Sequence, residues 1–239
     1  MKKNILITGM PRSGKSTLLN EIIQKYDRKV GFVTNEIREN NERIGFEIIT
    51  NEGRQAVLSS TTNVTEHKVS RYYVDISALD EIIPSVLSFN SDDLLYIDEI
   101  GQMELFSEKF KSLVLKYLDS PNTNVATISK IFSDDFIEMI KNRGDVVLVE
   151  IEESTRSEQF KFVLSLLGKI EKAKRYISDR GRFSVRKDNA TVTGDHAIRN
   201  LKSINGQWLC DCDYFKQYAI CSHTIALDEY LHIKNTPAL

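Results

Sequence analysis

The sequence predicts an α/β domain with a mostly parallel sheet over residues 1–168 and a small C-terminal domain over residues 181–239. In the first part, short apolar runs that read as buried strands alternate with amphipathic runs that read as helices. A glycine-containing loop separates the first such strand from the first helix, and all three cysteines lie within twelve residues near the other end. We expect a basic helical linker, residues 169–180, between the two domains.

Composition places the chain among soluble globular proteins. Of its 239 residues, 41% are hydrophobic and 28% are charged, and the formal net charge is −2. Apolar runs stay well below the roughly 18 residues that a membrane span needs, and the sequence before Gly9 lacks the apolar core of a signal peptide. We therefore expect a cytoplasmic protein without a membrane partner. An odd number of cysteines argues against a disulfide framework.

The strands and helices of the first domain follow from hydrophobic periodicity and turn residues. The expected strands are 4–8, 30–34, a hairpin over 35–50 that turns at 39–42, then 55–60, 71–74, 94–99, 124–129 and 146–150. The expected helices are 17–26, 77–89 with Pro84 as an interruption, 105–118, 132–142 and 154–174. In the second domain we expect strands at 183–186, 190–193 and 197–203 and a helix at 224–233.

The loop between the first strand and helix fits G-x-x-x-x-G-K-[ST], the phosphate-binding loop of P-loop NTPases. A loop entering a helix presents unpaired backbone N–H groups, and the helix dipole adds positive charge there. Lys15 is expected to reach the β- and γ-phosphates and Ser16 to coordinate Mg²⁺. The residues expected to bind a nucleoside triphosphate such as ATP are Gly9, Met10, Pro11, Arg12, Ser13, Gly14, Lys15, Ser16, Thr17 and Asp98.

The apolar run 94–97 ends in Asp98-Glu99, which is the Walker B pattern. Asp98 is expected to hold Mg²⁺ and Glu99 to orient and deprotonate the attacking water, which favours hydrolysis over binding alone. The alternative is a buried strand that ends in solvated carboxylates. Asp98 to Gly101 also spells D-x-x-G, but an N-K-x-D motif for guanine is missing, so base preference is not readable. Arg38 and Arg43 are candidates for stabilising the γ-phosphate, with surface salt bridges as the alternative.

The second domain contains Cys210-x-Cys212 and, eight residues later, Cys221-x-His223. Three thiolates and one imidazole form a closed tetrahedral Zn²⁺ set of the structural type, and the pattern uses every cysteine of the chain. Zinc would supply folding free energy to a domain whose core is small. The alternative is three unrelated buried cysteines and a surface histidine.

Positive charge is concentrated between the two parts. Residues 169–187 hold eight basic side chains against Glu171 and Asp179. Such a run is usually a solvated face or linker, and a nucleic-acid contact is the less common reading. The aromatic side chains of the second domain could stack on bases or serve as its core. They are Trp208, Tyr214, Phe215 and Tyr218.

Residues 1–168 resemble the THEP-type, or cancer-related, nucleoside-triphosphatases. The resemblance rests on four segments, in addition to the general Walker patterns. They are Thr8–Thr17, Val30–Arg38, Arg43–Phe46 and Ile97–Phe106. It implies a RecA-like P-loop fold and slow, base-tolerant hydrolysis of NTPs to NDPs and phosphate. The chain departs from the family's usual residues at Arg12-Ser13 and at Thr155-Arg156.

Residues 181–239 resemble a SWIM zinc domain, whose pattern is C-x-C-x(n)-C-x-H. Cys210, Cys212, Cys221 and His223 match that pattern, and Trp208 stands before the first cysteine as is typical. The resemblance implies binding of nucleic acid or protein.

Three functions are compatible with the sequence. The first is an Mg²⁺-dependent NTPase, with Lys15 and Glu99 in the catalytic roles and Arg38 and Arg43 as further candidates. The second is a P-loop kinase, because kinases share the loop and also need a nearby carboxylate. The third is a binding module in which NTP switches the grip of the zinc domain on nucleic acid.

Overall fold

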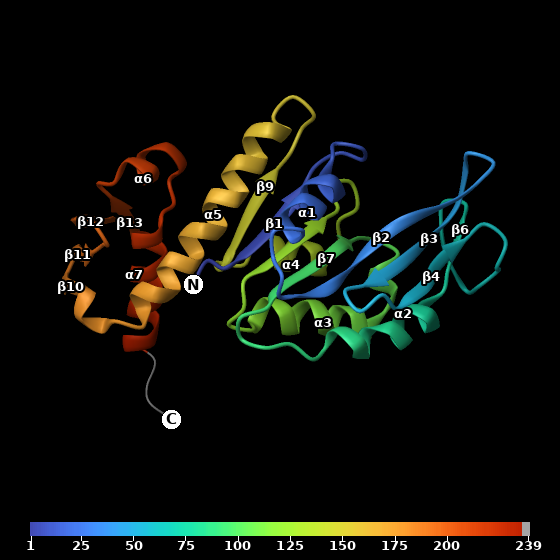
Figure 1. Ribbon diagram of the computed structural model, residues 1–239, viewed down its shortest axis with the longest axis horizontal. Helices are drawn as coiled ribbons and strands as arrows, with labels where there is room; N and C mark the ends of the chain where they lie inside the picture. The colour runs from blue at the N-terminus through green and yellow to red at the C-terminus, as the bar shows by residue number, and fades with distance from the viewer. Residues whose placement is uncertain (236–239) are drawn as a thin grey trace. The chain divides into compact units, whose positions relative to one another are not determined.

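The computed structural model describes residues 1–235, and Figure 1 shows its ribbon. The described chain divides into two compact units. One is Lys3–Lys161, and the other combines Met1–Lys2 with the chain from Phe162 onward. Among the helices of residues 1–235, none has the length and apolar character that crossing a membrane requires.

The first unit is built on one nine-stranded sheet. Its strand order is β5-β6-β4-β3-β2-β7-β8-β1-β9. The five strands from β2 to β9 in that order run parallel, and the remaining four are antiparallel. The strands are β1 (Asn4–Thr8), β2 (Lys29–Glu39), β3 (Glu42–Thr50), β4 (Gln55–Ser60), β5 (His67–Val69), β6 (Tyr72–Val74), β7 (Leu94–Ile100), β8 (Asn124–Ile128) and β9 (Val146–Glu150). The expected α/β fold with a mostly parallel sheet is confirmed.

Helices pack on the sheet through apolar stripes. The helices are α1 (Lys15–Ile23), α2 (Ile76–Ile82), α3 (Glu108–Asp119), α4 (Asp135–Lys141) and the start of α5 (Arg156–Ile177), with short 3₁₀ turns at Ile83–Val86 and Glu104–Phe106. One core cluster joins the buried side chains of α2, α3 and α4 to those of the central strands, including Phe32, Ile97 and Ala126. The central strands β1 and β8 are buried along their whole length, as parallel strands covered on both faces require.

The expected hairpin after the second strand is present, and it extends the sheet. β2 is eleven residues long, so its second half pairs with β3 after the parallel pairing with β7 ends at Phe32. Asn40 and Asn41 make the turn with φ of 48° and 65°, the left-handed geometry that a two-residue hairpin turn demands and asparagine tolerates. Arg38 and Arg43 become cross-strand partners, with a register shift between Ile37 and Arg38.

Several expected helices are shorter than the periodicity suggested. The helix over 132–142 spans only Asp135–Lys141 and the helix over 17–26 ends at Ile23, and two further cases have a clear local cause. The helix over 77–89 ends at Ile82 and continues only as a 3₁₀ turn, because Pro84 lacks the N–H that an α-helix would use. The helix over 105–118 begins only at Glu108. Its N-cap Ser107 has extended backbone, and its hydroxyl accepts the Phe110 N–H. The 3₁₀ turn before Ser107 contains Glu104, whose side chain lines a cavity of this unit.

The second unit contains a four-stranded antiparallel sheet and three helical segments. The strands β10 (Phe183–Arg186), β11 (Asn189–Thr193), β12 (Ile198–Ile204) and β13 (Gln207–Cys210) follow one another in order. The helices are the later part of α5, α6 (Asp213–Tyr218) and α7 (Ser222–Asn235), with a 3₁₀ turn at Arg180–Arg182. Because α5 is continuous from Arg156 to Ile177, the expected linker begins inside a helix. The domain limits 1–168, 169–180 and 181–239 stay a prediction.

Candidate functional site

A cavity of about 820 Å³ opens at the carboxyl ends of the parallel strands of the first unit. Its lining includes the loop after β1, the end of β7, the loop after β8 and the start of the β2–β3 extension. This is the edge at which open α/β sheets bind ligands. Its volume lies in the range of small-molecule sites.

The loop after β1 has the backbone geometry that its glycines predict. Gly14 caps α1 with φ of 98°, and a Cβ there would lie 2.7 Å from Cδ of Arg156. A Cβ on Gly9 would lie 2.4 Å from the carbonyl oxygen of Ile151. Both positions therefore need glycine, the first because of its left-handed backbone and the second because another strand end approaches closely.

Lys15 lies inside this loop. Its side chain is buried, and Nζ donates hydrogen bonds to the carbonyl oxygens of Gly9 at 3.2 Å and Met10 at 3.4 Å. A buried ammonium held by two carbonyls keeps three donors in one place, and phosphate oxygens are stronger acceptors for it than carbonyls. The geometry suits the expected contact with the β- and γ-phosphates.

Asp98 is brought to the loop from β7. Its carboxylate accepts hydrogen bonds from Ser16 at 3.1 Å and from Thr127 of β8. Burial raises the pKa of Asp98, while these hydrogen bonds and the positive charge of Lys15 lower it. Two oxygen ligands from different elements, Ser16 Oγ and Asp98 Oδ1, thus lie together, and oxygen is the donor type that Mg²⁺ prefers. The donor set fits the expected metal.

Glu99 follows Asp98 on β7 and lines the same cavity. Burial is the main cause that raises its pKa; the charge of Lys15 lowers it and that of Asp98 raises it further. A carboxylate with raised basicity beside a phosphate site is suited to accept a proton from water.

A further carboxyl, Glu104, lines the cavity and was not predicted from the sequence. A Cβ placed on Gly101 would lie 3.2 Å from Glu104 Oε2 and 3.7 Å from Glu99 Oε1, so the two carboxyls flank the same glycine. Burial raises the pKa of Glu104 to about 8. A glutamate in a stretch that reads as an amphipathic helix is ordinarily solvent-exposed. Only the 3₁₀ turn before Ser107 directs it inward.

The two candidate arginines differ in position. Arg43 lines the cavity, and its guanidinium is held by Glu36 at 2.8 Å and by the Tyr72 hydroxyl at 2.8 Å. Arg38 is not among the described residues that line the cavity. It pairs with Glu36 and with the Asn41 carbonyl, and its side chain is 53% exposed. The structure thus brings only Arg43 to the site.

The remaining expected loop residues differ in whether they line the cavity. Pro11, Arg12 and Thr17 line the cavity, and Met10 points outward with 53% of its surface exposed. Ser13 is buried, and its hydroxyl finds no hydrogen-bond partner among the described residues.

Several further lining residues were not assigned from the sequence, among them Arg156, Thr34 and Lys130. Arg156 lies against Gly14, Thr34 donates to the Asp98 carbonyl oxygen, and Lys130 pairs with Glu150. Strand order, which a single sequence does not display, is what brings them to the loop.

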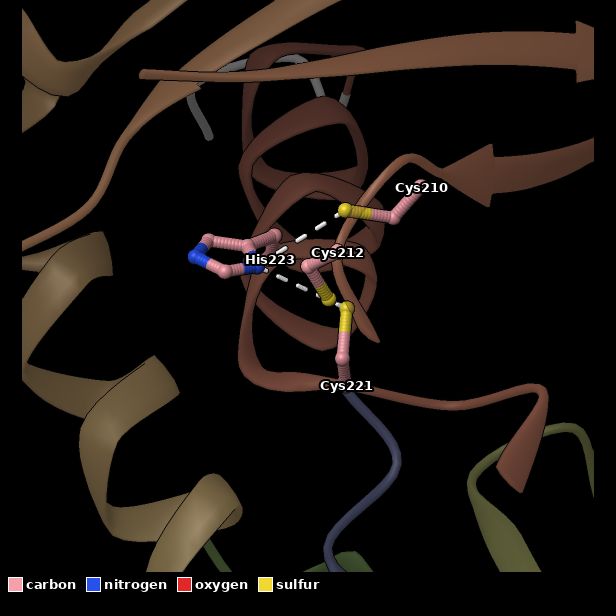
Figure 2. Close-up of side chains that lie close together, drawn as sticks. All are labelled: Cys210, Cys212, Cys221 and His223. Carbon is pink, nitrogen blue, oxygen red and sulfur yellow. Dashed lines mark hydrogen bonds between the residues drawn. The ribbon is translucent and has the colours of Figure 1, made fainter. Parts of the chain in front are cut away.

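The second unit holds the expected cluster of Cys210, Cys212, Cys221 and His223, all buried. Their ligand atoms lie within 4.8 Å of one another. Figure 2 shows the three sulfurs gathered on one side of the His223 ring, and Nδ1 lies 3.7 Å from Cys210 Sγ and 3.6 Å from Cys221 Sγ. Three sulfurs and one imidazole nitrogen converging in this way have the donor chemistry of a structural zinc site.

Local structure orients these four side chains. Cys210 ends β13, and Cys212 caps α6, where its sulfur accepts the Phe215 N–H at 3.4 Å. Cys221 stands before α7 in the same way, with the Thr224 N–H at 3.5 Å from its sulfur. The His223 ring stacks on Tyr176 at 5.9 Å between centroids. N–H···S bonds stabilise thiolates, so the surroundings also suit a metal.

The basic run is largely paired. Asp195 forms ion pairs with Lys172, Arg175 and Arg182, and Lys169 lies over the Tyr214 ring. Tyr214 and Tyr218 are half-buried, and their rings pack at a tilt of 46° with centroids 4.7 Å apart. They contact α5 through Ser165 and Phe162. These aromatics therefore serve in packing, and the ion pairs agree with the reading of the run as a structural face.

The first unit is similar to known proteins. The model of a family described as NTPase matches residues 4–164. The chain is 45% identical over 165 residues to "Nucleoside-triphosphatase THEP1" of Thermotoga sp. (strain RQ2), covering 68% of this chain and 94% of that protein. The chain belongs to the THEP1-type nucleoside-triphosphatase family. The human "Cancer-related nucleoside-triphosphatase" is 31% identical over 176 residues, covering 66% of this chain and 92% of that protein.

Solved structures of the family share the fold. The crystal structure of THEP1 from Aquifex aeolicus covers 69% of this chain and 98% of its own, with a TM-score of 0.62 and 35% identity. The solution structure of the human protein covers 69% and 97%, with a TM-score of 0.59 and 28% identity. The expected family and P-loop fold are confirmed. The family match ends at residue 164, before the cysteine cluster.

Ionisation of Glu104 is expected to make stability depend on pH. Between its ordinary pKa of 4.5 and about 8, the folded protein keeps a proton on Glu104 that the unfolded chain has lost. The contribution of protonated Glu104 to the free energy of unfolding is therefore fully present below pH 4.5 and is lost as pH rises toward 8. We expect Glu104→Gln, which cannot ionise, to unfold at a higher temperature than wild type at pH 8.5 and at a similar temperature at pH 4.5.

Thermal unfolding without nucleotide at several pH values measures this difference. Because one proton is involved, the difference in unfolding free energy between the two proteins cannot change by more than about 1.4 kcal/mol per pH unit. Unfolding temperatures of the two proteins that shift in parallel with pH would show that folding does not change the pKa of Glu104.

Proposed function

We propose that the chain hydrolyses nucleoside triphosphates to the diphosphate and phosphate with Mg²⁺ and with low base selectivity. The observation that supports this most directly is the convergence of Lys15, Ser16, Asp98 and Glu99 in one cavity. Family membership gives the same activity class independently, through relatives named nucleoside-triphosphatases.

In the proposed reaction, the loop N–H groups and Lys15 hold the β- and γ-phosphates at the positive end of α1. Ser16 and Asp98 would hold Mg²⁺, which when bound supplies positive charge against the phosphate oxygens. Glu99 accepts a proton from the water that attacks the γ-phosphorus. Arg43, which lines the cavity, lies near the γ-phosphate and stabilises its charge. Arg38 has no role in the reaction.

Low base selectivity is supported by the flank of the cavity beside Gly14. Arg12 and Arg156 line it, both are exposed, and both carry a planar guanidinium. A guanidinium can stack on the π-face of any base and does not require one particular hydrogen-bonding edge.

We further propose that the C-terminal unit holds one structural Zn²⁺ and recognises nucleic acid or a protein. The outward positions of its sheet support the nucleic-acid alternative. The strand residues among them include two cations, Arg186 and Lys202, and no carboxylate. These positions are Ser184, Arg186, Asn189, Thr191, Thr193, Ile198, Asn200, Lys202, Ile204, Gln207 and Leu209. Asp211, directly after β13, lies beside this face and accepts a hydrogen bond from Asn200.

Replacing Glu99 tests the hydrolytic mechanism. We expect Glu99→Gln to lower phosphate release from ATP about 100-fold or more, the usual contribution of a positioned base, while ATP still binds through the loop. Phosphate release and the binding of a fluorescent ATP analogue measure the two effects. Lys15→Ala is the contrasting variant, because it should lose binding as well. Phosphate release by Glu99→Gln at the wild-type rate would exclude Glu99 as the base.

Replacing a ligand of the cluster tests the metal. We expect wild type to contain one zinc per chain by elemental analysis and His223→Ala to contain almost none, with a lower unfolding temperature, because zinc binding and folding are coupled. His196→Ala is the matched control, since His196 is exposed in the same unit. Equal zinc content in the two variants would contradict the assignment.

Salt dependence tests the nucleic-acid alternative. If the sheet face binds single-stranded nucleic acid, the dissociation constant should rise steeply between 50 and 200 mM salt, because bound phosphates release counterions. We expect Lys202→Ala to reduce the salt slope by about one, measured by fluorescence anisotropy with a labelled oligonucleotide. Binding that is absent, or that salt does not change, leaves a protein as the partner.

A further inference from the structure

The cavity continues beyond the residues that hydrolysis needs. Strand order arranges its lining in a row, with Arg156 after β9, the phosphate loop after β1, and Glu99 on β7. Next to β7 come β2, β3 and β4, and these strands also contribute to the same cavity. A nucleotide that leaves its base near Arg156 and its γ-phosphate near Glu99 occupies only the first part of this row.

The rest of the cavity, which we call the far half, has a distinct lining. Its residues combine a carboxylate, a hydroxyl, an aromatic ring and apolar side chains. They are Thr34, Glu36, Phe46, Leu58, Val69 and Met103. Water as the attacking group would require no such surface, so the far half is suited to an organic molecule.

The polar groups of the far half are already held in place. Glu36 receives Arg43 at 2.8 Å on one carboxylate oxygen and Arg38 at 2.9 Å on the other. These ion pairs lower the pKa of Glu36 and keep it a hydrogen-bond acceptor. Arg43 also lies 5.0 Å above the centre of the Phe46 ring, which holds that ring against the cavity.

The far half is not suited to a second phosphate. Among the described residues that line it, only Met103 lies at a helix N-terminus, that of the three-residue 3₁₀ turn Glu104–Phe106. The guanidinium at its border, Arg43, pairs with Glu36, a carboxylate that it shares with Arg38. A carboxylate beside a guanidinium recognises hydroxyl groups, and an aromatic ring with apolar neighbours packs on the C–H face of a sugar ring. This combination selects a neutral hydroxylated ring.

We propose that the far half binds a neutral sugar or nucleoside whose hydroxyl group accepts the γ-phosphoryl group. The inference rests on the proposed NTP site, because the same loop and the same Glu99 serve both reactions. The acceptor oxygen forms a bond to the γ-phosphorus, and the bond from that phosphorus to the β–γ bridging oxygen breaks. The acceptor's proton passes to Glu99, and the diphosphate leaves with the electron pair. Where no acceptor is bound, water takes its place and hydrolysis follows.

The test uses the full chain with ATP and four separate probes, D-ribose, D-glucose, adenosine and uridine. Phosphorus NMR distinguishes a phosphate monoester from inorganic phosphate, and a parallel reaction without probe measures hydrolysis alone. We expect one probe class to yield monoester at least tenfold above a reaction without enzyme, with less inorganic phosphate. Comparing monoester yields between the sugar and the nucleoside probes identifies the class of acceptor that the site binds.

Two variants locate the acceptor. Glu36→Gln and Phe46→Leu should each lower the ratio of monoester to inorganic phosphate at least tenfold. The ratio is the readout because both residues contact Arg43, so that an effect through Arg43 on the γ-phosphate changes both products alike. Glu36→Gln keeps the side-chain volume, so it remains informative if Phe46→Leu folds poorly. Glu39→Gln, an exposed position on the same strand, is the matched control.

The outcomes separate the two proposals. Phosphate release without monoester from any of the four probes overturns the acceptor site and leaves the hydrolase intact. A ratio of monoester to inorganic phosphate that Glu36→Gln and Phe46→Leu do not alter overturns the far half as the location of the acceptor. Neither phosphate nor monoester from folded protein overturns the proposed NTP reaction itself.

Discussion

The buried carboxylate of Asp98 joins the elements on which the site depends. It lies near the end of β7 and accepts hydrogen bonds from Ser16 of α1 and Thr127 of β8. The positive charge of Lys15 lowers the pKa of Asp98. Burying a carboxylate costs several kcal/mol unless such partners compensate. The phosphate loop, β7 and β8 therefore have to adopt one mutual arrangement. That arrangement places Glu99 in the cavity that contains the loop.

The sequence predicted best what depends on local chain geometry. The loop after β1 and the Cys210–His223 cluster are short patterns in which residue type, spacing and backbone conformation act together, and Gly14 with its positive φ is an example. Turn chemistry was equally informative at Asn40-Asn41. In each case neighbouring residues supply the constraint, so one segment is enough to infer the structure.

Features that depend on distant segments could not be predicted in the same way. Glu104 reads as a helix-surface residue until Ser107 caps α3 and leaves a 3₁₀ turn before it. Arg38 and Arg43 look equivalent along the chain, but a register shift in the β2–β3 pairing and a shared Glu36 leave only Arg43 at the cavity. Arg156 meets Gly14 because β9 pairs with β1. Sequence separation hides the contact of Arg156 with Gly14, whereas the other two relations depend on a helix cap and on a strand register that the residue pattern alone does not show.

The sheet itself explains why one cavity has two parts. Parallel strands end at the same edge, so the loops after β1, β7 and β8 meet there, as ligand sites of open α/β sheets require. β2 is parallel to β7 for only four residue pairs and then pairs with antiparallel β3, which carries the sheet past that edge. The extension adds the wall that contains Glu36 and Phe46. A hydrolase could end its sheet at β2. The extra strands form the far wall of the same cavity, and this continuity links the catalytic loop to the proposed acceptor.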